Sequence, residues 1–217
     1  MTTAVLICAA GEGTRWYEQT KPKQLAWLGD ETIIQRQIRQ VKQRNAEPLV
    51  VTRDQQIQYA TWDNEGLTHS PASHRWLAET ILDTEYRWNY RTIILLGDVV
   101  YSGTLMDTIF ADTERLSVYG NNAEAMALVF RESGRIEVLN GLHKVLQSAE
   151  RGETPGKLWN LYRWLDGISL TEHRIRDDGI FRRVHDWSTD IDTPEDYRRF
   201  QHDILEMQII DDRLVQA

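Results

Sequence analysis

Short apolar runs alternate along the chain with longer stretches in which apolar residues recur at helical spacing. The apolar runs predict five β-strands, at residues 4–10, 48–52, 91–98, 125–130 and 179–184. The first run, AVLICAA, contains no polar residue, which is typical of a strand that is covered on both faces.

The stretches between these runs predict helices. One helix covers residues 30–44, with Asp30 as its N-cap and Ile33, Ile34, Ile38 and Val41 on one face. Others are expected at residues 75–88, 103–116, 142–150 and 157–165. The last helix spans residues 193–210, with Thr193 as N-cap and Pro194 at the first helical position.

Alternating strands and helices predict an α/β fold: a doubly wound, mostly parallel, Rossmann-like sheet in a three-layer α/β/α arrangement. Ligands in such folds bind at the carboxyl ends of the strands. Three polar segments are expected at this edge of the sheet. Residues 11–23 follow the first strand, Gly97 and Asp98 end the third, and residues 190–192 precede the last helix. We therefore expect one site built from all three.

Composition and charge exclude several classes of function. The 217 residues fit a single domain, 1–217, and the formal net charge of -8 argues against a nucleic-acid partner. Cys8 is the only cysteine, so an internal disulfide and a cysteine-based zinc site are excluded, and we expect it to be a small buried apolar residue. The chain shows neither a signal peptide nor an 18-residue apolar run, which predicts a cytoplasmic protein that does not bind membranes.

The glycines after the first strand form an unusual loop. Gly11 and Gly13 do not complete a dinucleotide fingerprint, because Trp16 stands where a third small residue is needed, and no P-loop sequence follows. Backbone amides of such a loop can bind phosphates, with Arg15 and Lys23 as charged partners. An ordinary strand-to-helix turn with solvated cations explains the same residues, and the spacing leaves both interpretations open.

Three segments together resemble a known family. Residues 6–15, LICAAGEGTR, followed by Pro22 and Lys23, resemble the signature of the nucleotidyltransferases that make activated sugars and alcohols. Residues 95–102, LLGDVVYS, resemble the second motif of this family, and residues 186–200 resemble the third, an acidic residue before Thr-Pro-Glu-Asp. Residues 31–41 also resemble the first helix of its sugar-phosphate and phosphocholine branches. The chain departs from the family at Ala10, where several members have glycine, and at Trp16, where others have Met or Leu.

The resemblance implies a nucleotide-diphospho-sugar transferase type of fold and a magnesium-bound nucleoside triphosphate (NTP). Asp98 and Asp192 are the implied metal ligands, and Asp190 is either a further ligand or a bystander. Arg15 and Lys23 are the implied catalytic residues. The implied nucleotide-binding residues are Ala9, Ala10, Gly11, Glu12, Gly13, Thr14, Arg15, Lys23 and Ser73.

The implied reaction joins an NTP to a small phosphomonoester and releases pyrophosphate. The acceptor can be a sugar phosphate, an alcohol phosphate such as phosphocholine, or a cofactor phosphate, and the base is not specified. In this family the region corresponding to residues 131–180 usually recognises the acceptor; here it is expected to bind the acceptor, to act as a lid or to form a homodimer contact, with Trp159 and Trp164 as candidates for the acceptor pocket.

Two other functions fit parts of the pattern. A non-catalytic nucleotide-binding or regulatory module of the same fold would keep the phosphate loop but would have less need of Arg15, Lys23 and both aspartates. A glycosyltransferase that uses an NDP-sugar would explain the Asp-Ile-Asp triplet at residues 190–192 as a metal motif, but would leave the cationic loop unexplained.

Overall fold

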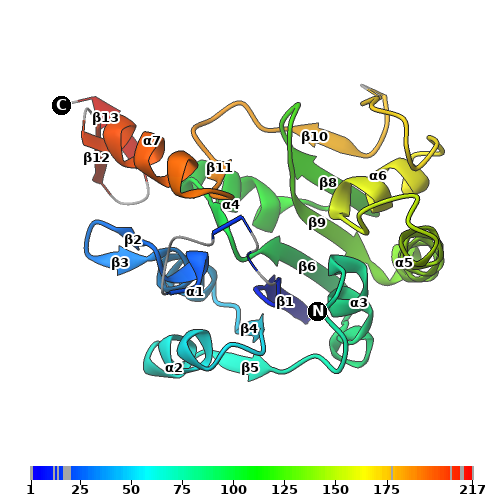
Figure 1. The fold of residues 1–217 in the computed structure, drawn as a ribbon, viewed down its shortest axis with the longest axis horizontal. Helices are drawn as coiled ribbons and strands as arrows, with labels where there is room; N and C mark the ends of the chain where they lie inside the picture. Colours follow the sequence, from blue (N-terminus) through cyan, green and yellow to red (C-terminus); the bar gives the residue numbers. More distant parts are fainter. Residues whose placement is uncertain are drawn as a thin grey trace.

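A computed structural model describes residues 2–11, 13, 15–16, 21–176, 178–205, 207–210 and 213–216. Its main feature is a seven-stranded sheet in the order β10-β8-β9-β6-β1-β4-β5 (Figure 1). The strands are β1 (Thr3–Cys8), β4 (Pro48–Val51), β5 (Leu67–His69), β6 (Arg91–Leu96), β8 (Leu116–Gly120), β9 (Ala125–Arg131) and β10 (Phe181–Arg183). Within this sheet β9 alone runs opposite to the rest, so the prediction of a mostly parallel sheet is confirmed.

Helices cover both faces of the sheet, which confirms the three-layer arrangement (Figure 1). One face is packed by α1 (Ile33–Lys42), α2 (Gln55–Asp63) and α4 (Gly103–Ala111), and the other by α3 (Leu77–Leu82), α5 (Arg135–Glu150) and α6 (Leu158–Leu165). Side chains of β1 alternate between the two cores, because successive residues of a strand point to opposite faces: Val5 and Ile7 enter one, Leu6 and Cys8 the other. Both faces of β1 are therefore buried, as its apolar sequence predicts, and Cys8 is 7% exposed.

Short elements lie between the main strands and helices and after the last helix. The hairpin of β2 (Trp27–Leu28) and β3 (Glu31–Thr32) follows the 3-10 helix η1 (Lys23–Leu25). Strand β7 (Val99–Val100) pairs antiparallel with β11 (Thr189–Asp190), directly before α7 (Pro194–Leu205). The remaining elements are η2 (Glu85–Arg87), η3 (Glu132–Gly134) and the hairpin β12 (Met207–Ile210) with β13 (Arg213–Gln216).

Several predicted boundaries are wrong. The helix expected at residues 103–116 ends at Ala111, and Leu116 starts the unpredicted strand β8. Helix α2 and strand β5 were also unpredicted, and the last helix ends at Leu205 rather than at residue 210 because the chain turns into β12.

The cap of α1 also differs from the prediction. Asp30 lies in the β2–β3 turn beside Gly29, which has a φ of 74°, and Thr32 caps the helix. The Thr32 hydroxyl accepts from the Gln35 amide at 3.4 Å, while the Gln35 side chain accepts from the Thr32 amide at 2.8 Å. The hairpin ends two residues after Asp30, so the first residue free to cap the helix is Thr32. The predicted cap of α7 is confirmed, because the Asp196 amide donates to the Thr193 hydroxyl at 3.1 Å.

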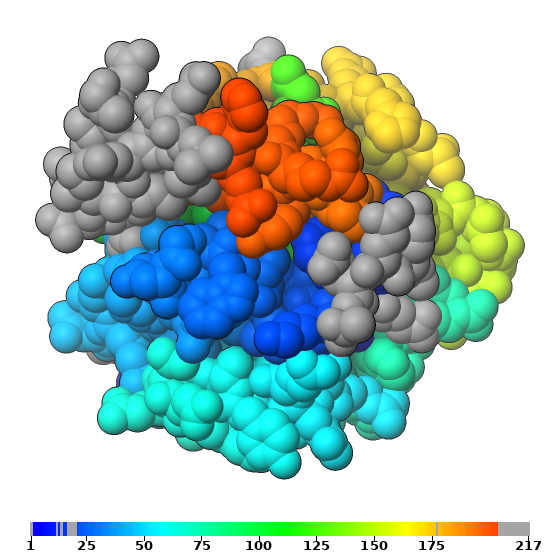
Figure 2. Space-filling view, turned by 60° about the vertical axis from the view of Figure 1, so that its left-hand side comes forward, coloured from blue at the N-terminus to red at the C-terminus, as the bar shows by residue number. Residues whose placement is uncertain are grey.

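The order of the strands fixes where a ligand can bind. The chain moves outward from β1 to β4 and β5, then returns to β6 on the other side of β1. The strand order therefore reverses between β1 and β6, and the carboxyl ends of these two strands form the crevice where open α/β sheets bind ligands. Figure 2 shows α7, in orange, against the N-terminal segments in blue. Among the described residues, no helix combines the length and the apolarity needed to span a bilayer.

Candidate active site

Gly97 brings the ends of β1 and β6 together. Its amide donates to the Cys8 carbonyl at 2.9 Å, and a Cβ at this position would lie 2.8 Å from the Cβ of Ala9. Any larger residue would push the strand ends apart. The Gly-Asp sequence therefore places Asp98 directly beside the start of the glycine loop.

Helix α1 holds the turn that carries Asp98. The buried Gln37 side chain donates to the carbonyls of Leu96 and Val99, at 3.0 and 2.6 Å, and Gln40 donates to the Tyr101 carbonyl at 3.0 Å. These buried hydrogen bonds attach the turn between β6 and β7 to α1.

The third polar segment pairs with the same turn. The Ile191 amide donates to the Asp98 carbonyl at 2.9 Å, and Asp190 lies opposite Val99 in the β11–β7 pair. The side chain of Ile191 enters a small core that includes Trp16, Val100 and Phe200. Residues 190–192, far from Asp98 in sequence, are thus attached to it through backbone pairing and apolar contacts.

Trp16 fixes the loop to this core. It is 6% exposed, its indole Nε1 donates to the Lys21 carbonyl at 3.0 Å, and its ring makes an edge contact with Tyr197 of α7. The bulky residue that departs from the family pattern therefore has a packing role between the loop and α7.

Lys23 connects the two predicted metal ligands. Its ammonium nitrogen lies 2.6 Å from Oδ2 of Asp98 and 2.7 Å from Oδ1 of Asp192, and its side chain is only 10% exposed. Arg15 forms an ion pair with the other carboxylate oxygen of Asp192. The structure therefore brings together four residues that the sequence predicted for one site.

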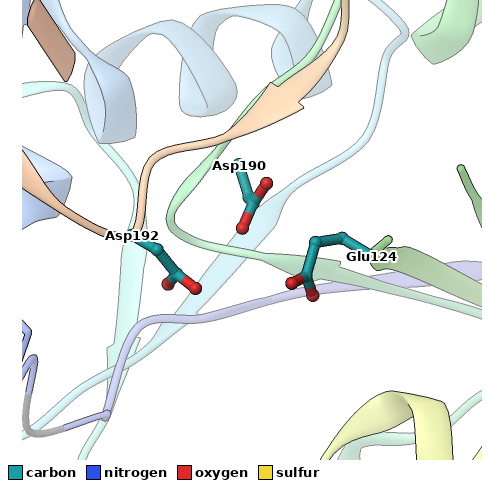
Figure 3. Close-up of side chains that lie close together, drawn as sticks. All are labelled: Glu124, Asp190 and Asp192. Carbon is teal, nitrogen blue, oxygen red and sulfur yellow. The ribbon is translucent and has the colours of Figure 1, made fainter. Parts of the chain in front are cut away.

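Three carboxylates form a group beside this network. Glu124, Asp190 and Asp192 point toward one another (Figure 3), and each offers an oxygen within 4.8 Å of the others. Asp192 belongs both to this group and to the Lys23 network. The adjacency of Asp190 and Asp192 agrees with the prediction that residues two apart in an extended segment point the same way.

Glu124 is the acidic residue that the sequence analysis missed. It precedes β9, whereas sequence reasoning looked for polar residues after strands. Because β9 runs antiparallel to β6, with Ala127 opposite Leu95, its beginning lies at the carboxyl edge of β6. Knowing that residues 125–130 form an antiparallel strand would have pointed to Glu124. The apolar sequence of this strand does not show the direction in which it runs.

Burial and neighbouring charges shift the pKa values of the acidic residues in different directions. Burial, reinforced by Asp190, raises the pKa of Glu124 to about 7, and burial with the Asp192 and Asp98 charges raises the pKa of Asp190 to about 6. Burial also opposes ionisation of Asp192, but Lys23 and Arg15 outweigh it and lower its pKa. The pKa of Lys23 is raised, because the two aspartates outweigh the effect of its burial. The carboxyl groups of Glu124 and Asp190 therefore keep their protons to a higher pH than ordinary acidic side chains, whereas Asp192 stays ionised.

Two cavities meet at these carboxylates. A cavity of about 220 Å³ is lined by Gly11, Gly13, Lys23, Asp98, Lys157 and Trp159, among others. A wider one, of about 510 Å³, extends toward Trp187 and α7. Both include Arg15, Glu124, Asp190 and Asp192 in their walls.

The predicted nucleotide-binding residues have different positions. Gly11 and Gly13 line the smaller cavity, while Ala9 and Ala10 are buried beneath the loop. Glu12 and Thr14 lie outside the described residues. Ser73 is exposed and is not among the described residues that line either cavity, so its role stays a prediction.

The region 131–180 contributes to the site through the start of α6. Lys157, Leu158 and Trp159 line the smaller cavity. Trp159 stacks on Phe181 and donates from its indole to the Ala123 carbonyl at 2.7 Å, whereas Trp164 packs in the core beneath α6 and is not among the described lining residues. Of the two predicted acceptor-pocket tryptophans, the structure therefore places only Trp159 at the site.

Comparison with solved structures shows which proteins share this fold. A nucleotidyl transferase from Methanothermobacter has a TM-score of 0.68 at 17% identity, covering 94% of this chain and 98% of that one. UDP-glucose pyrophosphorylase in complex with UDP-glucose has a TM-score of 0.65 at 13% identity, with coverages of 94% and 99%. CTP:phosphocholine cytidylyltransferase from Streptococcus pneumoniae has a TM-score of 0.63 at 14% identity, with coverages of 94% and 100%.

No protein-family model matches the sequence, and no curated protein matches it either. The similarity to solved structures alone therefore shows that the chain has the fold of nucleotidyltransferases.

Proposed function

We propose that this chain, which has the fold of nucleotidyltransferases, is a magnesium-dependent nucleotidyltransferase that joins an NTP and a phosphomonoester to give an NDP-activated product and pyrophosphate. The observation that carries the proposal is the convergence of Arg15, Lys23, Asp98 and Asp192 at the strand reversal between β1 and β6. A phosphate loop alone, as in a simple binding module, does not need two partly buried aspartates that are linked by a lysine.

The donor set fits a hard divalent cation. Asp98 and Asp192 each have a carboxylate oxygen in contact with the ammonium group of Lys23. The carboxylates of Asp190 and Glu124 lie next to Asp192. Magnesium in nucleotide sites takes one or two carboxylates together with substrate phosphates. We assign Asp98 and Asp192 as the holding residues, with Asp190 and Glu124 adjacent. When bound, magnesium would neutralise negative charge on the phosphate oxygens.

The residues of the chain supply alignment and charge. The amides of the loop that contains Gly11 and Gly13, with Arg15, would bind the β- and γ-phosphates. Lys23 would move from the aspartates toward the α-phosphate and stabilise the charge that develops there. Its present contacts with both carboxylates keep it in reach of that position.

The acceptor would attack without a general base. A phosphomonoester carries nearly two negative charges at neutral pH, because its second pKa is roughly 6. One of its oxygens forms a bond to the α-phosphorus, the bond from that phosphorus to the bridging oxygen breaks, and pyrophosphate leaves with the electron pair. Lys157, exposed at the rim of the same cavity, is placed to bind the acceptor phosphate.

Product analysis tests the proposal. The protein is incubated with magnesium, each of the four NTPs and a panel of sugar and alcohol phosphates, and pyrophosphate and the NDP product are measured. A parallel reaction supplies NDP-sugars and hydroxyl acceptors. Pyrophosphate release that requires a phosphomonoester supports the proposal; transfer from an NDP-sugar would indicate a glycosyltransferase, and NTP binding without turnover a non-catalytic module.

A further inference from the structure

A third cavity, of about 240 Å³, lies beside the active site between α6 and the segment that leads to β10. Its walls include Asn122, Trp159, Arg163, His173, Arg174 and Arg183. Three of these six side chains are guanidinium groups, and no described lining residue is acidic. The cavity is therefore positively charged, although the chain as a whole carries a net charge of -8.

Arg163 is the buried one of the three arginines that line this cavity. Its residue is 5% exposed, and its Nη1 donates to the Leu170 carbonyl at 2.8 Å while its Nη2 lies 2.9 Å from Nδ1 of His173. Its Nε is buried with no hydrogen-bond partner, and no carboxylate forms an ion pair with the side chain among the described residues. Burial lowers the pKa of this guanidinium. A buried charge without a counterion is costly, so an anion at this place would be favourable.

Two exposed arginines complete the cavity. Arg183 forms a hydrogen bond from its guanidinium to the Asn122 side-chain oxygen. The Arg174 side chain forms no hydrogen bond or ion pair within the described part of the chain, and the nearby carboxylate of Asp178 is paired with Arg176 at 3.3 Å. Arg174 is thus available to bind a ligand.

We propose that this cavity binds an oxyanion, the phosphate or carboxylate group of a small molecule, through Arg163, Arg174 and Arg183. Planar guanidinium groups suit the paired oxygens of both anions. Trp159 lines this cavity and the catalytic one, so the two meet at its side chain. The anion then has two sources: a second anionic group on the acceptor, which rests on the proposed function, or a separate anionic molecule, which does not.

The binding test uses inorganic phosphate as the probe and the His173 imidazole as the reporter. Histidine side-chain NMR signals are recorded during a phosphate titration at constant pH and ionic strength, with His173→Gln to assign the signal. We expect a saturable shift of the His173 signal. Arg174→Gln and Arg183→Gln should each weaken phosphate binding about tenfold, the scale of one charge-assisted hydrogen bond.

Arg151→Gln is the control for the loss of one positive charge, because Arg151 is an exposed arginine that does not line the cavity among its described walls. Both test positions are exposed, so folding is not at risk. Absence of a saturable shift in the millimolar range, or equal affinity in the wild type and both cavity variants, would overturn the proposal. This readout does not require any enzymatic activity.

Kinetics then separates the two sources. Pyrophosphate release is measured with pairs of phosphomonoesters that differ by a second anionic group. If the acceptor supplies the anion, Arg174→Gln raises KM about tenfold only for the doubly anionic member, again the scale of one charge-assisted hydrogen bond. If a separate molecule supplies it, added phosphate changes the rate with every acceptor, and Arg174→Gln removes this effect. Either result supports the cavity as an anion site.

Discussion

The ammonium nitrogen of Lys23 lies 2.7 Å from Oδ1 of Asp192, although 169 positions separate the two residues in the chain. The same nitrogen contacts Asp98, so one cation stands between two carboxylates that we assign to magnesium. The lysine thereby balances part of the negative charge of the site, and we expect it to become available for phosphate binding once magnesium takes over that role.

Replacing Lys23 with alanine should lower turnover about 10²–10³-fold, because one positioned donor at the reacting phosphate is lost. Steady-state pyrophosphate release measures the effect. The exposed Lys21, two residues earlier, gives the control variant Lys21→Ala, which should stay near wild type. A loss below about threefold in Lys23→Ala would remove this residue from the chemistry.

The carboxylates should contribute unequally to magnesium binding and to turnover. Asp192→Asn should abolish magnesium-dependent turnover and the rise in melting temperature with magnesium and NTP, because Asp192 belongs to both the Lys23 network and the acidic group. Asp98→Asn should abolish turnover as well, whereas Glu124→Gln should retain turnover and require more magnesium. Glu195→Gln, at an exposed position on α7, is the control. Full turnover of Asp192→Asn at equal magnesium would refute the assignment.

Glu124 and Asp190 should lower the stability of the metal-free protein as pH rises from about 4 to about 7. Burial and neighbouring carboxylates raise the pKa of Glu124 to about 7 and that of Asp190 to about 6, so in this interval these two groups bind more protons in the folded state than in the unfolded chain. The free energy of unfolding then falls as pH rises. Urea unfolding with a chelator present measures it, and Glu124→Gln should flatten the dependence. An unchanged slope in that variant would contradict the assigned cause.

Lys157→Ala should raise KM for the acceptor about tenfold, the scale of one charge-assisted hydrogen bond, with little change in KM for the NTP. The reason is its place in the cavity wall, at the start of α6 rather than on the glycine loop. Initial rates with each substrate varied in turn separate the two constants. Lys144→Ala, on the exposed surface of α5, is the control; an effect confined to the NTP would place Lys157 on the nucleotide side instead.

Gly97→Ala should destabilise the fold by about 1–3 kcal/mol, the usual cost of forcing extra atoms into a packed site. The new methyl group would lie 2.8 Å from the Ala9 Cβ and 3.0 Å from the Cys8 carbonyl oxygen. Gly11→Ala is the control for stability, because a Cβ there meets nothing within 4 Å. Urea unfolding compares the two, and equal stability would show that the strand ends separate without cost.

The strongest sequence signals led to correct expectations where a residue type is needed for a local reason. The cap at Thr193 and the uninterrupted apolar run of β1 each follow from short-range hydrogen bonding or burial. Helix α2 and strand β8 were missed, because their apolar patterns are short and neighbouring elements decide their form.

The sequence by itself determined the alternating strands and helices, the cationic glycine loop and the identity of the two acidic segments, since these depend on residues close together in the chain. Only the tertiary structure decided which side chains meet. The reversed direction of β9 brings Glu124 to Asp190 and Asp192, and the pairing of β7 with β11 brings Asp192 to Lys23. Strand direction and pairing partner are set by how the whole apolar surface is buried, and this sum over distant residues leaves no trace in any short stretch of sequence.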